Sequence, residues 1–433
     1  MVLEMRKMKD SGIEWIGEIP EGWRTINPKA LFTQRKDKAQ KGERQLTSSQ
    51  QYGILYQDDY MELTGSKVVT VEKDFDILKH VEAGDFVISM RSFQGGLEYS
   101  TKSGAISSAY IMLVPNLELV YPRFYRWLLK SSVYIDALQR TTNMVRDGQA
   151  MRYSNFAQVR LFTLPLDEQK SRADFLDLEC SSIDKILFKT RSSIEEYKKL
   201  KQAVITQAVT KGVRGEREMK DSGVEWIGEI PREWDVTKIG RIGQTSSGAT
   251  PLRSKETSFF DDATIRWVRT LDLNDGLVYD SSEKITELAL SMSACSIMPT
   301  GTVCVAMYGG AGTIGKCGLL MTPCATNQAV CSIICNSNVI LPKFLLNQLL
   351  ALKPYWMKYA VGTRKDPNIS QDTVARMKVL IPPLSEQKEI AAYLDAKCAE
   401  IDGLIAKKEQ LVKELESYKK SLIYEVVTGK REV

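Results

Sequence analysis

The strongest constraint on this chain is that it carries the same motifs twice. Residues 8–20 are MKDSGIEWIGEIP and residues 219–231 are MKDSGVEWIGEIP, and a tryptophan follows three residues after each copy. Internal repeats have to be recognised before local patterns because they determine the architecture. The chain is therefore predicted to contain two structurally equivalent halves.

A second pair of motifs marks the end of each half. PLDEQK at 165–170 matches PLSEQK at 383–388, and the match continues without a gap to the Val-Thr pairs at 209–210 and 427–428. The C-terminal tail VVTGKREV corresponds to AVTKGVRG, which in the first half leads directly into the second MKDSG copy. The repeat thus closes on itself, and we expect pseudo-two-fold symmetry with the termini close together.

The segments between these motifs share a pattern but differ in their residues. Apolar runs at 86–90 and 303–307 follow Gly84 and Gly301, and each is a predicted strand. PRFYRWLLK at 122–130 parallels PKFLLNQLL at 342–350, and each has proline at the position favoured at a helix start. The residues after the two strands, RSFQGGLEY and YGGAGTIGK, are unlike. One scaffold is therefore predicted to carry two different sets of loops.

Two long stretches, 167–209 and 385–427, contain no proline and alternate charged with apolar residues. In the second stretch one heptad row holds Ile401, Leu415 and Leu422 and another holds Leu404, Leu411 and Tyr418, with Lys408 as a polar interruption. The first stretch repeats these rows with Ile183, Tyr197 and Val204 and with Ile186 and Leu200. This periodicity predicts a coiled coil of two antiparallel helices, each about 60 Å long. The alternative is an ordinary long helix packed on a globular core.

These patterns predict an α+β protein with an internal pseudo-two-fold repeat, in which two mixed α/β domains are joined by two long antiparallel helices. The predicted segments are a repeat segment at 1–20, a domain at 21–163, a central long helix at 164–215, a second repeat segment at 216–231, a second domain at 232–381 and a C-terminal long helix at 382–433.

Several functional classes are disfavoured by residue usage. No apolar run approaches the roughly 20 residues that cross a bilayer, and the N-terminus lacks a secretory signal, so the chain is expected in the cytoplasm. The chain has one histidine, His80, and eight cysteines without a CxxC pair, which disfavours catalytic triads and zinc sites. The net charge of +5 permits a polyanionic partner without requiring one.

Two short motifs suggest catalysis but do not fit it. GAGTIGKC at 310–317 matches GxxxxGK, yet no helical pattern follows it, as a phosphate-binding loop requires. DPNI at 366–369 only partly matches the [ND]PP[YF] tetrapeptide of amino-methyltransferases. The carboxylates near residue 80 form no pattern typical of a nuclease. We therefore expect a binding protein without a catalytic centre or cofactor of its own.

Together these motifs resemble the specificity subunits of Type I restriction-modification systems. The resemblance rests on two WIGEIP-x-x-W segments, two EQ segments that begin long helices ending in VT and a basic tail, and two unlike domains between them. It spans essentially the whole chain. SMRSFQGG, YGGAGTIGK, ATNQA and GTRKDPNIS are also similar to loops of that family's target-recognition domains.

The resemblance implies that each domain reads one half of a bipartite double-stranded DNA target and that the helices set the unspecified spacer. It also implies that two modification subunits dock on the helices and methylate adenine with S-adenosylmethionine, and that restriction subunits join them with ATP and Mg²⁺. A fixed distance between two reading domains suits a gapped target, as half-site spacing does in dimeric repressors.

Arginine and lysine can contact guanine edges or phosphates, and asparagine or glutamine can pair with adenine. On this chemistry, the candidate DNA contacts are Arg91, Ser92, Gln94, Arg146 and Gln149 in the first domain and Tyr308, Thr313, Lys316, Asn327, Arg364, Lys365 and Asn368 in the second. Trp15 and Trp226 are interpreted as hydrophobic packing residues at the repeat junctions.

Two alternatives belong to other functional classes. A coiled-coil adaptor would bind protein through its helices and would not bind DNA. A fused nuclease-methyltransferase would need the catalytic motifs that are missing above.

Overall fold

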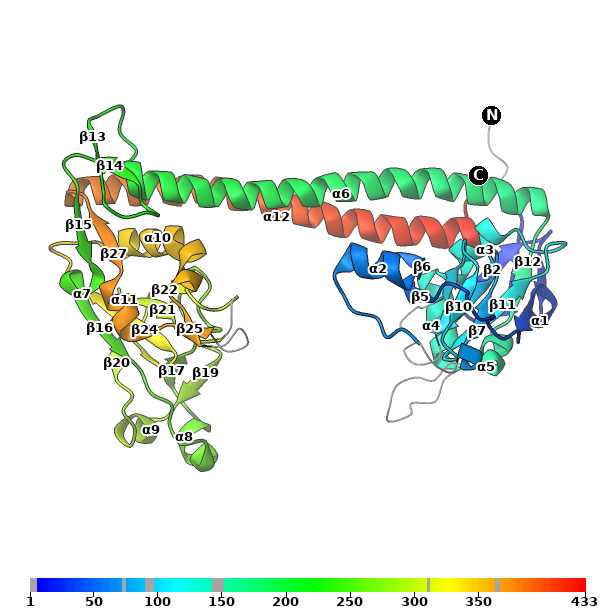
Figure 1. Ribbon diagram of the computed structural model, residues 1–433, viewed down its shortest axis with the longest axis horizontal. Coiled ribbons are helices and arrows are strands. Elements are labelled where there is room, and N and C mark those ends of the chain that lie inside the picture. Colours follow the sequence, from blue (N-terminus) through cyan, green and yellow to red (C-terminus); the bar gives the residue numbers. More distant parts are fainter. Residues whose placement is uncertain (1–5, 72–74, 90–96, 142–151, 310–311, 363–366) are drawn as a thin grey trace. The chain divides into compact units, whose positions relative to one another are not determined.

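The computed structural model describes residues 6–71, 75–89, 97–141, 152–309, 312–362 and 367–433 (Figure 1). The chain forms two compact units, one of residues 1–191 and 410–433 and one of residues 192–409. Each unit contains one copy of the repeated motifs and part of both long helices. The α+β architecture predicted from the sequence is confirmed.

The first unit is built on an antiparallel sheet with the strand order β4-β11-β8-β9. The strands of this sheet are β4 (Phe32–Arg35), β11 (Tyr110–Pro115), β8 (Phe86–Ser89) and β9 (Leu97–Tyr99). Four strand pairs surround it: β1 (Met8–Ile13) with β2 (Gly17–Pro20), β3 (Arg24–Ile26) with β12 (Leu161–Thr163), β5 (Leu46–Ser49) with β6 (Gly53–Tyr56), and β7 (Lys79–Val81) with β10 (Gly104–Ile106). The short helices are α1 (Pro28–Leu31), α2 (Gln57–Thr64), η1 (Phe75–Ile77), α3 (Pro122–Leu129), α4 (Ser132–Arg140) and α5 (Tyr153–Gln158).

The second unit contains a larger sheet with the order β16-β24-β21-β22-β18. Its strands are β16 (Gly243–Ser247), β24 (Val330–Cys335), β21 (Val303–Ala306), β22 (Cys317–Leu320) and β18 (Gly276–Val278). A second sheet has the order β19 (Glu283–Ile285), β17 (Ile265–Val268), β23 (Cys324–Thr326), β20 (Ile297–Met298). Three pairs are β13 (Met219–Asp221) with β14 (Glu229–Pro231), β15 (Asp235–Lys238) with β27 (Lys378–Ile381), and β25 (Val361–Gly362) with β26 (Pro367–Asn368). The short helices are α7 (Ile239–Ile242), η2 (Arg253–Lys255), α8 (Glu256–Phe260), α9 (Glu287–Ser291), α10 (Pro342–Leu352), η3 (Lys353–Lys358) and α11 (Gln371–Arg376).

The two main sheets are equivalent strand by strand. β4-β11-β8-β9 corresponds to β16-β24-β21-β22, and only the second unit adds β18, which runs parallel to β22. The predicted strands after Gly84 and Gly301 are β8 and β21, and both glycines adopt positive φ angles of 106° and 87°. The predicted helices begin at Pro122 and Pro342. The structural repeat expected from the sequence is thus confirmed.

The two long helices are α6 (Leu166–Lys211) and α12 (Leu384–Val427), close to the predicted bounds. Within each unit they lie side by side and antiparallel (Figure 1). In the first unit Lys419 Nζ donates to Asp184 Oδ1 at 2.6 Å, and in the second Lys201 Nζ donates to Asp402 Oδ1 at 2.8 Å. These two ion pairs join equivalent residues of the repeat, so the helix pairing has the same register in both units.

The first predicted heptad row is buried at Ile183, Ile401 and Leu422 and half-buried at its other apolar members, but the second predicted row is wrong. Ile183, Ile401 and Leu422 are 1–6% exposed. The residues predicted for the second row are 36–48% exposed, namely Ile186, Leu200, Leu404, Leu411 and Tyr418. The buried second row lies one residue later, as at Leu187. On a helix, the positions three and four residues after a given residue lie on opposite sides of it. The partner helix and the domain cover only the side of the fourth position.

The repeated tryptophan and EQ motifs contact each other in both units. The Trp23 indole Nε1 donates to Glu168 Oε2 at 3.1 Å, and Trp234 Nε1 donates to Glu386 Oε2 at 3.0 Å. Both tryptophans are fully buried. Each contact joins the start of a repeat to the first turn of a long helix, which explains why the two motifs occur together.

The glutamine of each EQ motif holds a loop of its own unit. The Gln169 carboxamide accepts a hydrogen bond from Tyr121 N at 2.7 Å, and Gln387 accepts one from Leu341 N at 2.8 Å. Each side-chain NH₂ also donates to two backbone carbonyls. A buried amide that satisfies both its donors and its acceptor is a strong orienting group. These glutamines fix the long helices against α3 and α10.

The remaining repeated tryptophans pack against the domains, as interpreted from the sequence. Trp15 meets Tyr134 edge to face at 5.4 Å between ring centroids, and Trp226 lies 6.0 Å from Tyr355. Trp226 is 7% exposed. Both rings pack against hydrophobic clusters of their units.

The two ends of the described chain meet in the first unit. Arg6 forms a hydrogen bond with Glu168, and Arg172 links Glu168 to the carbonyl oxygen of Arg431 at 2.9 Å. Lys430 Nζ also donates to the carbonyl of Ile16 at 3.2 Å. The expectation that the repeat closes on itself is therefore confirmed.

Of the helices in the described ranges, none combines the length and the apolar content that crossing a bilayer requires.

Candidate nucleic-acid interface

The second unit brings several predicted contacts to one end of its main sheet. Met307 N donates to the carbonyl of Ala329 at 2.8 Å, and Ile369 N donates to the carbonyl of Met307 at 3.0 Å. These bonds join the segment after β21, the turn between β23 and β24, and the end of β26. The predicted residues therefore lie on adjoining segments, namely Tyr308, Thr313, Lys316 and Asn327 on loops and Asn368 at the end of β26.

Their exposure differs. Tyr308 is 40% exposed, Lys316 and Asn368 are half-buried, and Thr313 is only 9% exposed. Asn327 uses its side-chain oxygen within its own turn, where it accepts from Ala329 N at 3.2 Å. Tyr308 is thus the most exposed member of this group, and Lys316 is its half-buried cation.

The glycine-rich motif forms the connection between two antiparallel strands. β21 and β22 pair in register at Val305 and Cys317, and the connection closes where Ala306 N donates to the carbonyl of Lys316 at 2.8 Å. A strand follows the motif instead of a helix, so the helix N-terminus that a phosphate-binding loop requires does not follow it. A side chain at Gly309 would lie 2.9 Å from Thr313 Cγ2, so Thr313 packs inside the connection.

Two polar side chains at this end of the sheet were not predicted from the sequence. Thr250 and Gln328 are exposed and hydrogen-bonded to each other. Gly248 allows this approach, because a Cβ there would lie 1.7 Å from the carbonyl oxygen of Thr326. Gln328 could have been found because it follows Asn327 in the ATNQA segment. Nothing in the local sequence marks Thr250.

Basic side chains next to this turn are already paired with acids. Asn327 N donates to the carbonyl of Val268 at the end of β17. Arg266 of β17 contacts Asp280 at 3.1 Å. Arg269, which follows β17, contacts Glu283 of β19 at 2.7 Å. These arginines contribute less positive potential than their number suggests. Among the described residues Lys316 has no ion-pair partner.

The predicted contacts in the first domain fall outside the described residues, as do two in the second. They are Arg91, Ser92, Gln94, Arg146, Gln149, Arg364 and Lys365. The turn equivalent to Asn327 is described, and there Ser107 Oγ accepts a hydrogen bond from Ala109 N at 3.3 Å. The scaffold of the turn is thus the same in both units, while the residue that stabilises it differs.

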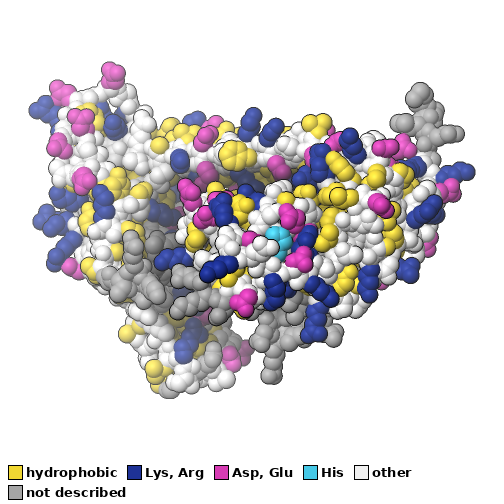
Figure 2. All heavy atoms as spheres, turned by 45° about the vertical axis from the view of Figure 1, so that its right-hand side comes forward, with side chains coloured by type: hydrophobic (Ala, Val, Ile, Leu, Met, Phe, Trp, Pro, Cys, Tyr) yellow, Lys and Arg dark blue, Asp and Glu magenta, His cyan; other side chains and the backbone are white. Residues whose placement is uncertain are grey.

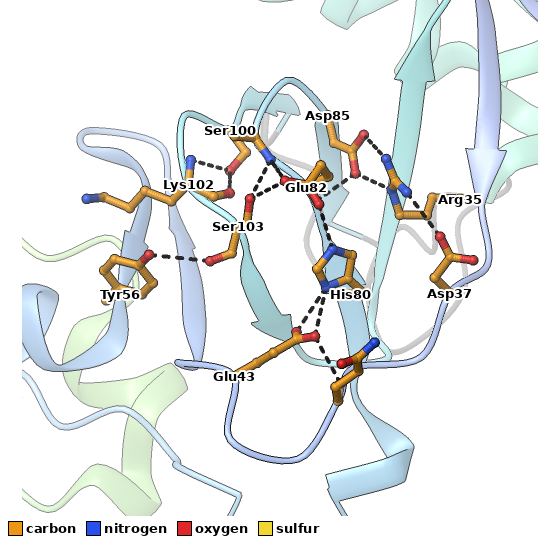
Figure 3. Close-up of polar contacts among 12 residues, drawn as sticks. Arg35, Asp37, Glu43, Tyr56, His80, Glu82, Asp85, Ser100, Lys102 and Ser103 are labelled. Carbon is orange, nitrogen blue, oxygen red and sulfur yellow. Dashed lines mark hydrogen bonds and ion pairs between the residues drawn. The ribbon is translucent and has the colours of Figure 1, made fainter.

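The single histidine belongs to a polar network in the first unit (Figure 3). His80 Nδ1 lies 3.0 Å from both oxygens of Glu43, and Nε2 lies 3.1 Å from Glu82. Burial lowers the pKa of His80, but the hydrogen bonds to both carboxylates outweigh it, so the pKa is raised. The hydrogen bond from Ser103, followed by that from His80, lowers the pKa of Glu82 to about 2. Both imidazole nitrogens are engaged, so His80 is unsuited to act as a base.

A second ion pair in this network fixes the start of β8. Arg35 Nε donates to Asp85 Oδ2 at 2.6 Å, and Asp85 is 2% exposed (Figure 3). In Figure 2 the His80 imidazole is visible at the surface of the first unit, with acidic and basic side chains beside it. The ranges described in the structure contain no group of three or more acidic, histidine or cysteine side chains that could hold a metal ion. The hydrogen bonds of the network link β7 and the start of β8 and so support the sheet.

Comparisons with known proteins show what this chain is similar to. Residues 231–414 match the family described as the Type I restriction modification DNA specificity domain. The chain is 25% identical to the MjaVIII specificity subunit of a Type I restriction enzyme from Methanocaldococcus jannaschii, over 81% of this chain and 80% of that relative. It is 22% identical to the putative MjaX specificity subunit of the same organism, over 96% and 95% of the two chains. The second half of the chain thus carries a Type I restriction modification DNA specificity domain, and the chain as a whole is similar to Type I specificity subunits.

Solved structures share the fold of this chain. One chain, from a structure on complex assembly and conformational transition of the type I R-M system, superposes with a TM-score of 0.72 at 14% identity and covers 95% of this chain and 99% of its own length. The HsdS subunit from Thermoanaerobacter tengcongensis has a TM-score of 0.51 at 14% identity, covering 95% and 98%. At this identity the likeness concerns the fold alone. The family match covers the second globular domain and the first part of α12.

Proposed function

We propose that this specificity subunit directs a Type I restriction-modification complex to a bipartite DNA target and that each globular domain reads one half of it. The observation that carries the proposal is the pair of equivalent sheets with unlike loops. β8 and β21 occupy the same place in the two units, but the residues that follow them differ. Equivalent scaffolds place the loops alike, and different loop residues recognise different base sequences.

In the second domain, Tyr308 and Lys316 are the proposed principal contacts, because both keep exposed surface at the same end of the sheet. Lysine can bind a guanine edge or a phosphate, and the tyrosine hydroxyl can donate to either. Asn368 and the exposed Gln328 lie on adjoining segments and extend this surface. In the first domain Arg91, Ser92, Gln94, Arg146 and Gln149 remain predictions from the sequence.

A domain exchange tests this function. Residues 21–163 are replaced by the equivalent domain of a relative that methylates a different sequence. Because the loops of each domain belong to a separate unit, we expect one half of the methylated sequence to change completely and the other half to stay the same. Sequencing the methylated genome of a host that carries the gene and its modification partner measures the result.

The reciprocal exchange of residues 232–381 is the matched control, and it should change only the other half-site. A single exchange that altered both half-sites would contradict the assignment of one domain to each half. Family membership gives no support to the alternative of a coiled-coil adaptor that does not bind DNA.

We further propose that modification subunits dock on the exposed apolar rows of the long helices. Ile186 and Tyr418 are 48% and 47% exposed in the first unit, and the equivalent residues Leu404 and Leu200 are 36% and 48% exposed in the second. Exposed apolar surface repeated on a polar helix pair is typical of a protein interface. Because the rows occur twice, two equivalent partners are expected. These partners would supply the S-adenosylmethionine site, and restriction subunits would supply ATP and Mg²⁺ chemistry.

Light scattering tests the number of partners. The wild-type chain should bind two modification subunits at saturation. Changing Leu200 and Leu404 together to serine removes the apolar row of one unit only, so we expect the mass to fall to that of a complex with one modification subunit. Lys407→Ser, at an exposed position of the same helix, should keep both copies. A wild-type complex that saturates with one copy would contradict the proposal.

A further inference from the structure

The short helix η3 supports the connection between β21 and β22 that carries Lys316. Trp356 and Lys353 both belong to η3, and they reach the chain on the two sides of Lys316. Residues three apart in a 3₁₀-helix point in the same direction. One short element can therefore contact both neighbours of the proposed DNA contact.

The first contact is between Trp356 and Gly315. Gly315 has a φ of +77°, and a Cβ at this position would lie 2.1 Å from the indole Cδ1. The indole thus touches the backbone directly, and only glycine fits. Trp356 is fully buried, and its Nε1 has no hydrogen-bond partner within the described ranges. A buried indole with an unpaired donor is unfavourable, so Trp356 under Gly315 is not explained by hydrogen bonding of its own.

The second contact reaches Cys317 through Asp275. Asp275 N donates to the carbonyl of Cys317 at 2.8 Å, and its carboxylate accepts from Cys317 N at 3.0 Å. The other carboxylate oxygen pairs with Lys353 Nζ. Asp275 also has a φ of +59°, which is uncommon for a residue with a side chain. The backbone N–H and the carbonyl of Cys317 are thus both hydrogen-bonded to Asp275. Asp275 in turn is held by Lys353 of η3.

We propose that Trp356 and Lys353 are positioning residues that hold Lys316 for target readout by the second domain. The inference rests on the proposed function of this domain. Base readout requires a side chain whose backbone does not move, since freedom lost on binding reduces both affinity and discrimination. The contacts that η3 and Asp275 make with Gly315 and Cys317, here called the bracket, supply that rigidity. Lys316 lies between these two residues and has no ion-pair partner in the described structure.

Trp356, Lys353 and Asp275 all belong to the second unit. In the first unit the helix equivalent to α10 is followed by α4, a regular helix, instead of by η3. Loss of the bracket should therefore affect one half-site only. General destabilisation of the complex would affect both half-sites alike, which makes the two explanations distinguishable.

The test uses the full chain in complex with its modification subunits. The target is first identified from the methylated genome, and duplex oligonucleotides carrying single-base changes in either half then serve as probes. Trp356→Phe and Lys353→Met are compared with Lys358→Met, which removes a cation from the same helix where it pairs with the exposed Glu225. We expect the first two variants to reduce discrimination at the second half-site about tenfold, roughly what one base contact contributes, and Lys358→Met to change neither half-site.

Trp356→Phe alters a core residue, so its thermal midpoint is measured as well. Lys353→Met tests the same idea at a position whose side chain is 37% exposed. Folded variants that retain second-site discrimination, or that lose it equally at both sites, would overturn the proposal. If the wild-type complex itself discriminates at neither half-site, the proposed function fails before the variants are compared.

Discussion

Replacing Glu386 by glutamine is expected to destabilise the second unit by about 3 kcal/mol, the lower end of what breaking a buried ion pair costs. Glu386 is fully buried, and its carboxylate accepts from Trp234 Nε1 at 3.0 Å and from Arg217 Nη2 at 2.6 Å. Glutamine has nearly the same shape but carries no charge. It would leave the Arg217 guanidinium, which is 15% exposed, without its closest counter-ion.

Urea unfolding of the full chain, followed by circular dichroism, measures this change as a shift of the transition midpoint. Glu389→Gln is the matched control, because it is the same substitution about one turn further along α12. Glu389 pairs with Arg214, and both side chains are 47% exposed, so solvent already screens this pair. We expect no measurable shift for the control. Equal midpoints for the two variants would show that the buried carboxylate does not hold the repeat to the helix.

The scaffold could be predicted largely because its motifs are written twice. The tryptophan of WIGEIP-x-x-W and the glutamate of the EQ motif recur at matching positions, and they proved to contact each other at Trp23 and Glu168 and at Trp234 and Glu386. Two occurrences of one contact constrain the fold more strongly than either motif alone. The start of α3 and α10 at proline followed from local backbone chemistry in the same way.

The second heptad row could not be assigned from apolar residues alone. Leu404 and Ile405 are both apolar and lie on either side of the buried row at Ile401. Periodicity places the row of Leu404 and the row of Ile405 equally near the contact between the two helices. Only the position of the partner helix and of the domain decides which row is covered. The row that remained exposed is the one proposed to bind modification subunits. An apolar residue in a heptad pattern thus indicates an interface without saying which chain covers it.

The candidate site could be predicted only in outline. The sequence placed Lys316 and Asn327 in loops, but it did not reveal that Asn327 stabilises its own turn. It also did not associate Thr250 or Trp356 with these loops, because both come from distant segments and depend on close approach to a backbone at Thr326 or Gly315. Contacts of this kind follow from tertiary packing, and no local pattern announces them.

Lengthening both long helices by one heptad is expected to change the spacer of the DNA target and leave both half-sites unchanged. The insertions belong between Arg191 and Ser192 and between Glu409 and Gln410, where the two compact units divide. At these points the contacts of each unit are preserved, including the Asp184–Lys419 ion pair in the first. Seven residues keep the buried rows in phase to within about 20°. The same insertion in one helix alone would shift its apolar positions against the other and should mainly destabilise the pair.

Each long helix would become longer by about 10 Å. This length corresponds to about three base pairs along B-DNA at about 3.4 Å per pair. Added base pairs also turn the second half-site around the duplex axis, so the new spacer need not equal the old one plus three. The expectation is therefore a changed number of unspecified bases between two unchanged half-sites. Sequencing the methylated genome of a host with the doubly extended chain reads out both properties together. An active, folded double insertion that kept the original spacer would mean that a part of the complex other than these helices sets the distance between the half-sites.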